Sequence, residues 1–311
     1  MRAPARAIIR ASMSLIAVGT LAFDSIQTPF ERREEVLGGS VTHFAHAARH
    51  FGALDIVGVV GTDFPDGLLK RFTGLGIGVS GVEIASGKTF RWSGRYEADW
   101  NTRHTLDTQL NVFEHFDPKV PSALRSARFV FLANAQPAVQ MKALAQMKAP
   151  LLVVADTMNL WIDIKLGELE ELLRKVHGLV VNEEEALMLT GRRNLFQAAR
   201  ILLEKGPRFV IVKKGEHGAF LLGREVRFAL PAYPVEEVVD PTGAGDSFAG
   251  GFMGYLASVE NLDPPTLRRA MLYGTATASF CVEGFSVEGL ERADRSRLEA
   301  RFNELSALVT P

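Results

Sequence analysis

The segment "VVDPTGAGDSFAGGF", residues 238–252, joins a proline, a turn of small residues and an aspartate to the start of a helical pattern. Gly243 and Gly245 let the backbone adopt positive φ, and they leave N–H groups pointing outward with no side chain in the way. A helix that begins near Asp246 adds its own unpaired N–H groups and the positive end of its dipole. The segment therefore predicts an anion-binding site at the N-terminus of a helix.

An aspartate beside an anion site needs a chemical explanation. In the simplest alternative, Asp246 only caps the helix, and the later glycines allow close helix packing. In the other, the chain transfers a phosphoryl group: the Asp246 carboxylate takes a proton from the attacking hydroxyl while backbone donors stabilise the transferred charge. The combination of anion site and carboxylate favours the second explanation, in which the donors belong to Gly243, Ala244 and Gly245.

Composition narrows the class of protein. The 311 residues include 35 basic and 36 acidic ones, for a formal net charge of −1. This balance provides no electrostatic surface for nucleic acid or an anionic membrane, and no apolar run reaches the roughly 18 residues that span a bilayer. The single cysteine, Cys281, excludes an internal disulfide and fits a reducing cytosol. We expect a cytoplasmic protein whose partners are small molecules, with no nucleic acid and no membrane.

The N-terminal sequence is similar to a signal peptide, because arginines precede an apolar run. We interpret the run from Leu15 instead as a first buried strand that ends at Asp24. Residues 1–12 are then an N-terminal extension before a start at Met13, and residues 13–311 form one domain.

Short apolar runs alternate with helical patterns along the rest of the chain. Alternation of this kind predicts a mostly parallel sheet with helices on both faces, which is an α/β architecture. The runs cover residues 15–19, 55–61, 127–133, 150–156, 178–182 and 208–215.

Residues 80–113 interrupt this alternation, since they lack helical periodicity and are rich in aromatic and polar side chains. We predict a hairpin that stands off the main sheet. Long insertions in compact domains are more often functional than decorative, so we expect a lid that closes over the substrate and keeps water out. Its candidate substrate contacts are Phe90, Trp92, Arg95 and Asn101.

The segment "DPTGAGDSFAGGF" also resembles the signature of the ribokinase-like carbohydrate kinases, the PfkB family. The resemblance continues from Met13 onward through "LGGSVTHFAHAARHFG", "VGVVGTDFPDG", "VVADTMNLWI", "VVNEEEALMLTG" and "VIVKKGEHGAFLL". It implies a three-layer α/β/α fold with a mostly parallel central sheet and a small β lid built from roughly residues 24–38 and 84–113. The N-terminal half and the lid segment are most similar to a bacterial branch of nucleoside or sugar kinases.

The resemblance implies roles for residues on the acceptor side. Asp246 would be the catalytic base, with the preceding small residues as the anion hole. Asp24 matches an aspartate that binds sugar hydroxyls, and Gly38 and Gly39 match a pair whose backbone lies against the substrate. His43 stands where the family usually has an asparagine that contacts the sugar, so this chain departs from the pattern there.

On the nucleotide side, the family uses the pair Asn182 and Glu185 to order magnesium-bound water and phosphate oxygens. The same spacing is also a helix capping box, and the two roles can coexist. Lys213 and Lys214 are either an exposed strand end or basic groups near the phosphates, and the resemblance favours Lys213. The residues it places at the nucleotide are Asn182, Glu185, Lys213, Gly215, Gly218 and Gly274, the last in the place of an asparagine near adenine.

The sequence predicts no tightly bound metal ion, but it contains candidate contacts for Mg²⁺ and for a monovalent cation. No set of His, Cys and carboxylate residues indicates a tightly held ion, which suits Mg²⁺ that arrives with ATP and contacts Glu185 through water. Asp240 and Thr242 lie in a loop that often binds a monovalent cation such as K⁺ in the family; alternatively, Asp240 only stabilises its turn. The three histidines of residues 43–50 share a helical face, but no fourth ligand is indicated.

Three other functions compete with a kinase. A dinucleotide oxidoreductase would need a G-x-G-x-x-G turn directly after the first strand, and none occurs there. A hydrolase would use Ser247, but no histidine follows His217, so its base would come from earlier in the chain. A sensor that had lost catalysis would not be expected to keep Asp246.

We therefore predict a PfkB-family kinase that transfers the γ-phosphoryl group of ATP to a primary hydroxyl of a nucleoside ribose or a free sugar. An aromatic lid can stack on a base, which favours a nucleoside, although the same side chains could form the hairpin's own core. Lids in the family sometimes pair across a dimer, so a homodimer through the lid is a further hypothesis.

Overall fold

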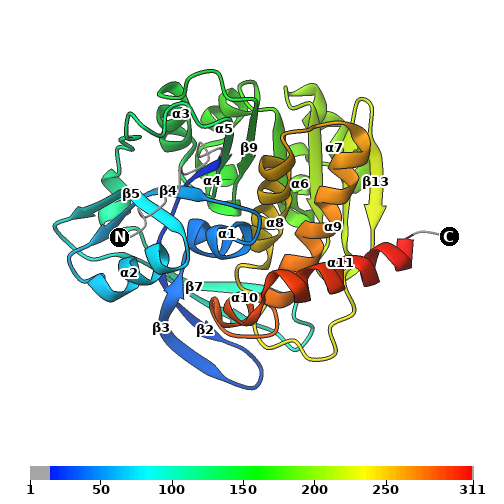
Figure 1. The fold of residues 1–311 in the computed structure, drawn as a ribbon. Helices are drawn as coiled ribbons and strands as arrows, with labels where there is room; N and C mark the ends of the chain where they lie inside the picture. Colours follow the sequence, from blue (N-terminus) through cyan, green and yellow to red (C-terminus); the bar gives the residue numbers. More distant parts are fainter. Residues whose placement is uncertain (1–14, 310–311) are drawn as a thin grey trace, which may run out of the picture.

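The computed structural model describes residues 15–309, and the predicted extension at residues 1–12 and start at Met13 lie outside this range. A nine-stranded sheet forms its centre, in the order β13-β12-β11-β10-β9-β8-β1-β4-β5 (Figure 1). Its pairs are parallel except β11 with β12 and β12 with β13. The strands are β1 (Leu15–Val18), β4 (Leu54–Gly61), β5 (Ile77–Ala85), β8 (Phe129–Leu132), β9 (Leu152–Asp156), β10 (Gly178–Asn182), β11 (Phe209–Lys213), β12 (Ala219–Gly223) and β13 (Arg227–Leu230). The prediction of a mostly parallel sheet is confirmed.

Helices cover both faces of this sheet. Alternate side chains of a strand point to opposite faces, and in β1 Leu15 and Ala17 join one apolar cluster while Ile16 and Val18 join the other. The first cluster takes in side chains from α1 (Ser40–Ala48), α2 (Asp66–Gly74), α8 (Ala244–Val259), α9 (Pro264–Cys281), α10 (Glu288–Arg292) and α11 (Arg295–Val309). The second takes in α3 (Pro137–Ala145), α4 (Asn159–Ile164), α5 (Leu166–Leu173), α6 (Glu183–Thr190) and α7 (Leu195–Glu204).

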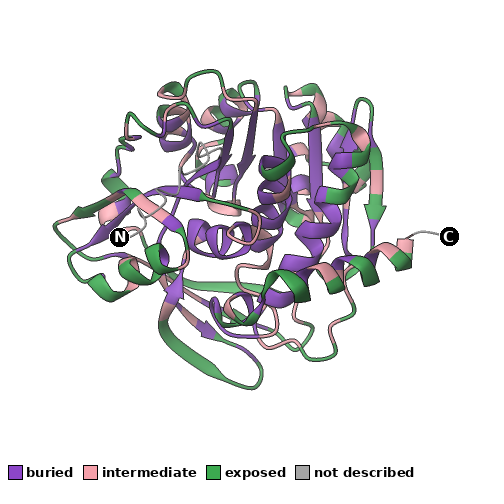
Figure 2. Cartoon of the chain, in the orientation of Figure 1, coloured by how far each residue is buried: buried purple, intermediate pink, exposed green. Residues whose placement is uncertain are grey.

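Burial follows these three layers. The central strands are buried along most of their length, while the outward faces of the helices are exposed (Figure 2). No helix within residues 15–309 has both the length and the apolar character needed to cross a membrane. The predicted three-layer α/β/α architecture is therefore the one observed.

A second, four-stranded sheet stands off the first, in the order β3-β2-β6-β7, and is called the lid below. Its strands are β2 (Ala22–Gln27), β3 (Arg32–Gly38), β6 (Phe90–Tyr96) and β7 (Arg103–Gln109). Figure 1 shows the blue β2–β3 hairpin projecting from the body of the molecule. The start of the chain departs from the expectation, because the first strand ends at Val18 and Asp24 lies within β2 of the lid. A Cβ on Gly19 would lie 2.8 Å from the Cβ of Ala133, and the chain leaves the central sheet at this closely packed glycine.

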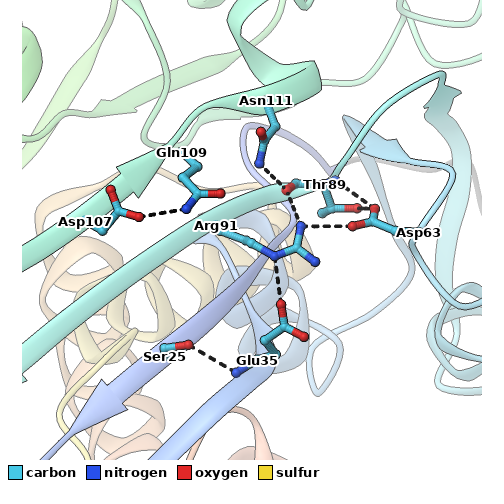
Figure 3. A network of polar contacts seen from close by, with 8 residues as sticks. All are labelled: Ser25, Glu35, Asp63, Thr89, Arg91, Asp107, Gln109 and Asn111. Carbon is cyan, nitrogen blue, oxygen red and sulfur yellow. Dashed lines mark hydrogen bonds and ion pairs between the residues drawn. The ribbon is translucent and has the colours of Figure 1, made fainter.

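An ion-pair network joins the lid to the central sheet (Figure 3). Arg91 of β6 donates to Glu35 of β3 at 2.8 Å and to Asp63, just after β4, at 2.9 Å. The Asp63 carboxylate also accepts from the backbone N–H and the hydroxyl of Thr89, each at 2.7 Å. These contacts hold the base of the lid at the end of β4.

Candidate active site

Three neighbouring strands end in polar residues at one edge of the central sheet. β9 ends at Asp156, β10 at Asn182 and β11 at Lys213, and Asn182 lies opposite Lys213 in the strand register. Because parallel strands have their carboxyl ends at the same edge, these side chains converge where open α/β sheets bind their ligands.

The predicted anion loop lies against this edge. Gly243 adopts φ 77° as the N-cap, and α8 begins at Ala244, so Asp246 lies in the first turn and does not cap the helix. A Cβ built on Gly245 would lie 2.7 Å from Lys213 Nζ. The loop is therefore bare backbone beside an ammonium group. The first-turn N–H groups of a helix have no partner within that helix, and here the N–H of Ala244 donates to the carbonyl oxygen of Pro241 at 3.2 Å.

Asp246 is a partly buried carboxyl with several charged groups nearby. Burial raises the pKa of Asp246 well above its usual value, and the negative charge of Asp156 adds to the shift while Lys213 opposes it. Burial and then Asp156 also raise the pKa of Glu185 to about 7. A carboxylate with a raised pKa is a stronger proton acceptor than one on the surface, which suits a general base.

Lys213 and Asp156 form a buried ion pair, with Nζ 3.2 Å from Oδ2. Burial disfavours the charged ammonium, but Asp156, Glu185 and Asp246 outweigh it and raise the pKa of Lys213. Asp156 was not among the predicted site residues. The sequence did contain a signal for it, because an aspartate that ends a buried strand beside the strand of Asn182 falls at the same sheet edge.

Asn182 and Glu185 form the capping box that their spacing predicts. Asn182 Oδ1 accepts from the Glu185 N–H at 2.8 Å, and Glu185 Oε2 accepts from the Asn182 N–H at 2.8 Å. The structural role is therefore present. Since Glu185 is also electrostatically linked to Lys213 and Asp156, the pair lies within the same site.

Asp24 reaches the site from the lid. Its side chain is 6 % exposed, and a Cβ on Gly38 would lie 2.0 Å from Asp24 Oδ2, so the carboxylate occupies the space beside that glycine. Burial raises the pKa of Asp24 to about 7, opposed by a backbone N–H of Gly39 and assisted by Asp240. The charge of Asp24 also raises the pKa of Asp246, which places the two carboxyls in one site.

His43 packs directly beneath the anion loop. A Cβ on Gly243 would lie 2.2 Å from its Nδ1, and Cys281 Sγ lies 3.8 Å from the same nitrogen. Burial, with the nearby His46, lowers the pKa of His43 to about 3, so the ring is neutral near pH 7. Residues 15–309 contain no cluster of histidine, cysteine and carboxylate that could hold a metal ion, so the histidines of α1 form no such site.

A narrow cavity separates the lid from the central domain. Phe90 lies opposite Ala22 in the register of β2 and β6, which places it two residues along from Asp24. The side chain of Asn134 is held by Trp161, whose Nε1–H donates to Asn134 Oδ1 at 3.0 Å. The cavity has about 10 Å³ of free space, which is room for about one water. Its lining includes Thr20, Phe90, Thr108, Asn134, Met158 and Trp161.

The other lid residues lie apart from this cavity. Trp92 Nε1 donates to Thr105 at 3.3 Å within the lid, and Arg95 is exposed and pairs with Glu97. Asn101 instead reaches the turn after β11, where its amide donates to Glu216 at 3.2 Å.

The turn after β11 carries the other predicted nucleotide residues. Gly215 and Gly218 adopt φ 52° and 82° at the ends of the 3-10 turn η2 (Gly215–His217). Gly274 lies elsewhere: it is buried in α9, and a Cβ there would lie 2.8 Å from the carbonyl oxygen of Phe248 in α8. An open hollow of about 300 Å³ lies beside η2 and is lined by Lys214, His217, Ala219, Phe220, Leu230 and Pro231.

Asp240 stabilises the loop before α8. Asp240 is fully buried, and its Oδ1 accepts from the Thr242 N–H at 2.9 Å. Burial raises the pKa of Asp240 to about 6. The turn-stabilising role of Asp240 is therefore present.

A sequence profile of the pfkB family carbohydrate kinases matches residues 11–291 of the chain. The chain belongs to this family. The predictions of family, fold and a phosphotransferase acting on a hydroxyl group are thereby confirmed.

Relatives of the chain include a cytidine kinase of Thermococcus kodakarensis, 32 % identical over 247 residues, which are 78 % of this chain and 87 % of that protein. Two solved structures share the fold. A Burkholderia thailandensis nucleoside kinase in complex with inosine aligns with TM-score 0.78 at 18 % identity, over 94 % of this chain and 99 % of that one. An Escherichia coli protein in complex with ATP and Mg²⁺ aligns with TM-score 0.76 at 20 % identity, over the same shares.

Ser247 does not support a hydrolase. Its side chain is fully buried in α8, where a substrate cannot reach it. The nearby histidine, His43, has a pKa lowered to about 3 and would be a weak base.

Proposed function

We propose that the protein is an ATP-dependent kinase that phosphorylates the primary hydroxyl of a nucleoside. The observation that carries this proposal is the partly buried Asp246 carboxyl in the first turn of α8, directly after the bare anion loop and close to Lys213. A hydroxyl acceptor next to Asp246 and a phosphoryl group in the loop are the two partners that this arrangement fits.

The reaction transfers one phosphoryl group and one proton. The acceptor oxygen forms a bond to the γ-phosphorus as the bond from that phosphorus to the β–γ bridging oxygen breaks, and ADP leaves. Asp246 takes the proton of the acceptor hydroxyl. The N–H groups of the anion loop stabilise charge on the transferred group.

Mg²⁺ fits the nucleotide side of this site. Three carboxyls, those of Asp156, Glu185 and Asp246, act on the ammonium of Lys213, and Asp24 acts on Asp246, which leaves a surplus of negative groups and oxygen donors. Mg²⁺ prefers oxygen ligands and keeps several waters, so we propose that Glu185 contacts it through water. The ion, when bound with ATP, would neutralise phosphate charge.

The cavity beside Asp24 favours a nucleoside over a free sugar. A ribose hydroxyl bound at Asp24 would direct its base toward Phe90, Asn134 and Trp161, which offer aromatic surface and an amide. The names of the Thermococcus and Burkholderia relatives agree with this class of acceptor. Since the free space is small, the lid must open for the base to enter.

The test is ADP formation by the purified protein with Mg²⁺ and ATP against cytidine, uridine, inosine, adenosine, ribose and fructose. We expect activity with at least one nucleoside, and no turnover of its 5′-deoxy analogue, which should still compete for binding. If only ribose or fructose is phosphorylated, the acceptor is a free sugar and not a nucleoside. If the protein binds ATP but is inactive with every acceptor, the alternative of a sensor without catalytic activity would be favoured.

Three further properties are part of the proposal. Asp240 and Thr242 are candidates for a K⁺ site, and replacing NaCl by KCl should then raise kcat.

A homodimer through the lid is supported by its exposed apolar side chains, among them Phe30 at 85 % and Leu106 at 55 % exposure, and light scattering after gel filtration would test it. A cytoplasmic location agrees with the lone buried Cys281.

A further inference from the structure

Lys213 is held where a transferred phosphoryl group would lie. It is the last residue of β11, so its backbone is fixed by the central sheet. Its ammonium lies 2.7 Å from the point where a Cβ on Gly245 would be, and Gly245 belongs to the anion loop. The ammonium therefore lies beside the backbone of the anion loop.

The ion pair with Asp156 does not explain this lysine by itself. Removing two charges from water costs free energy that their attraction often fails to recover, so a buried pair is weak support for stability. The Lys213 side chain retains 16 % exposure, which leaves the ammonium reachable by a ligand in the site. It is also attracted by Glu185 and Asp246, so three carboxyls share one cation.

We propose that Lys213 is a catalytic residue of phosphoryl transfer, and this inference rests on the proposed kinase function. Its ammonium donates a hydrogen bond to a non-bridging oxygen of the transferred group and neutralises charge that grows as the bond to ADP breaks. Lys213 stays protonated throughout, and the proton of the acceptor goes to Asp246. Asp156 holds the ammonium in place through the Nζ–Oδ2 contact of 3.2 Å.

The neighbouring lysine has a different position. Lys214 follows the strand end and lines the open hollow beside η2, on the outer side of the turn. Successive side chains of a strand point to opposite sides, which agrees with this division. The inference therefore concerns Lys213 alone.

The test compares Lys213→Met with Lys213→Arg and with a matched control, Lys205→Met. Lys205 also pairs with a carboxylate, Glu170, but on α5 and the segment after α7, away from the site. We expect Lys213→Met to lower kcat about 100-fold or more, as the loss of one transition-state donor does, with KM for ATP changed less than about five-fold. Lys213→Arg should recover part of kcat, and Lys205→Met should match the wild type.

Several outcomes would overturn the inference. A folded Lys213→Met with kcat within about three-fold of wild type would do so, and so would a raised KM for ATP at unchanged kcat, which marks ground-state binding only. If Lys213→Met does not fold, the double variant Lys213→Met/Asp156→Asn removes both members of the ion pair and is compared with Asp156→Asn alone. An inactive wild type would instead refute the kinase function on which the inference rests.

Discussion

The hydroxyl of Thr242, next to the anion loop, donates to the hydroxyl of Tyr96 in the lid at 3.2 Å. This contact joins the lid to the loop before α8. Tyr96 is 7 % exposed, and burial raises its pKa to about 12, so it is a neutral hydrogen-bonding group near pH 7. Lid closure and the anion loop are thus physically connected.

Tyr96→Phe should weaken lid closure. The loss of one hydrogen bond is worth about 0.5–1.5 kcal/mol, so we expect kcat/KM for the acceptor to fall about 2- to 10-fold. ADP formation without acceptor should rise, because a looser lid admits water. Tyr233→Phe, which removes a surface hydroxyl bonded to Glu304, is the control. Equal effects of the two variants would show that the Tyr96 contact has no role in closure.

Asp24 should make acceptor binding depend on pH. Burial raises the pKa of Asp24 to about 7, so the carboxyl becomes protonated as the pH falls below that value; it then loses its negative charge and part of its capacity to accept hydrogen bonds. We expect KM for the nucleoside to rise as the pH falls from 8 to 6, because hydrogen bonds to an ionised carboxylate are stronger than those to a neutral carboxyl. Asp24→Asn should raise this KM and remove its pH dependence, with KM for ATP unchanged. A variant that keeps the wild-type pH profile would remove Asp24 from acceptor binding.

Gly243→Ala should disable the anion loop. Residue 243 has φ 77°, which costs an alanine about 1–2 kcal/mol, and the added Cβ would meet the ring of His43. The loop must shift, and we expect kcat to fall about 100-fold while the protein stays folded. Gly167→Ala in α5 is the control, since nothing lies within 4 Å of a Cβ there. Full activity of Gly243→Ala would contradict this account of the loop.

Asp63 should contribute to stability in a pH-dependent way. Burial by itself would raise the pKa of Asp63, but hydrogen bonds from Thr89 and Arg91 outweigh burial and lower this pKa below its usual value of 3.8. Its contribution is therefore complete above about pH 5 and is lost as the pH falls through the folded-state pKa. We expect the melting temperature of Asp63→Asn to fall less than that of the wild type between pH 5 and 3. Asp163 is exposed, so the melting temperature of Asp163→Asn should change with pH as that of the wild type does. Equal falls in melting temperature for the wild type, Asp63→Asn and Asp163→Asn would refute the role of Asp63.

Local sequence patterns predicted the parts of the molecule that depend on neighbouring residues. The anion loop at residues 243–245 and the Asn182–Glu185 capping box are of this kind, because a glycine turn and an N-cap are local features. The end of the first strand was predicted too late, since only contact with Ala133 and Ser40 shows that Gly19 is where the chain leaves the sheet.

Residues that depend on strand order were harder to predict. Asp156 joins Lys213 because β9, β10 and β11 are neighbours, and Asn134 lines the cavity because β8 lies next to β1. The aromatic side chains of the lid divided between the two alternatives: Phe90 faces the cavity, whereas Trp92 packs within the lid. Gly274 packs closely against α8, since its small size lets α9 approach Phe248.

The most direct test of the central claim is the rate of ADP formation by Asp246→Asn with Mg²⁺, ATP and the best nucleoside. Asparagine keeps the shape of the side chain and cannot take the proton, so we predict a kcat at least about 100-fold below wild type with ATP still bound. Asp163→Asn should retain wild-type activity. A folded Asp246→Asn that turns over at the wild-type rate would contradict the assignment of Asp246 as the base.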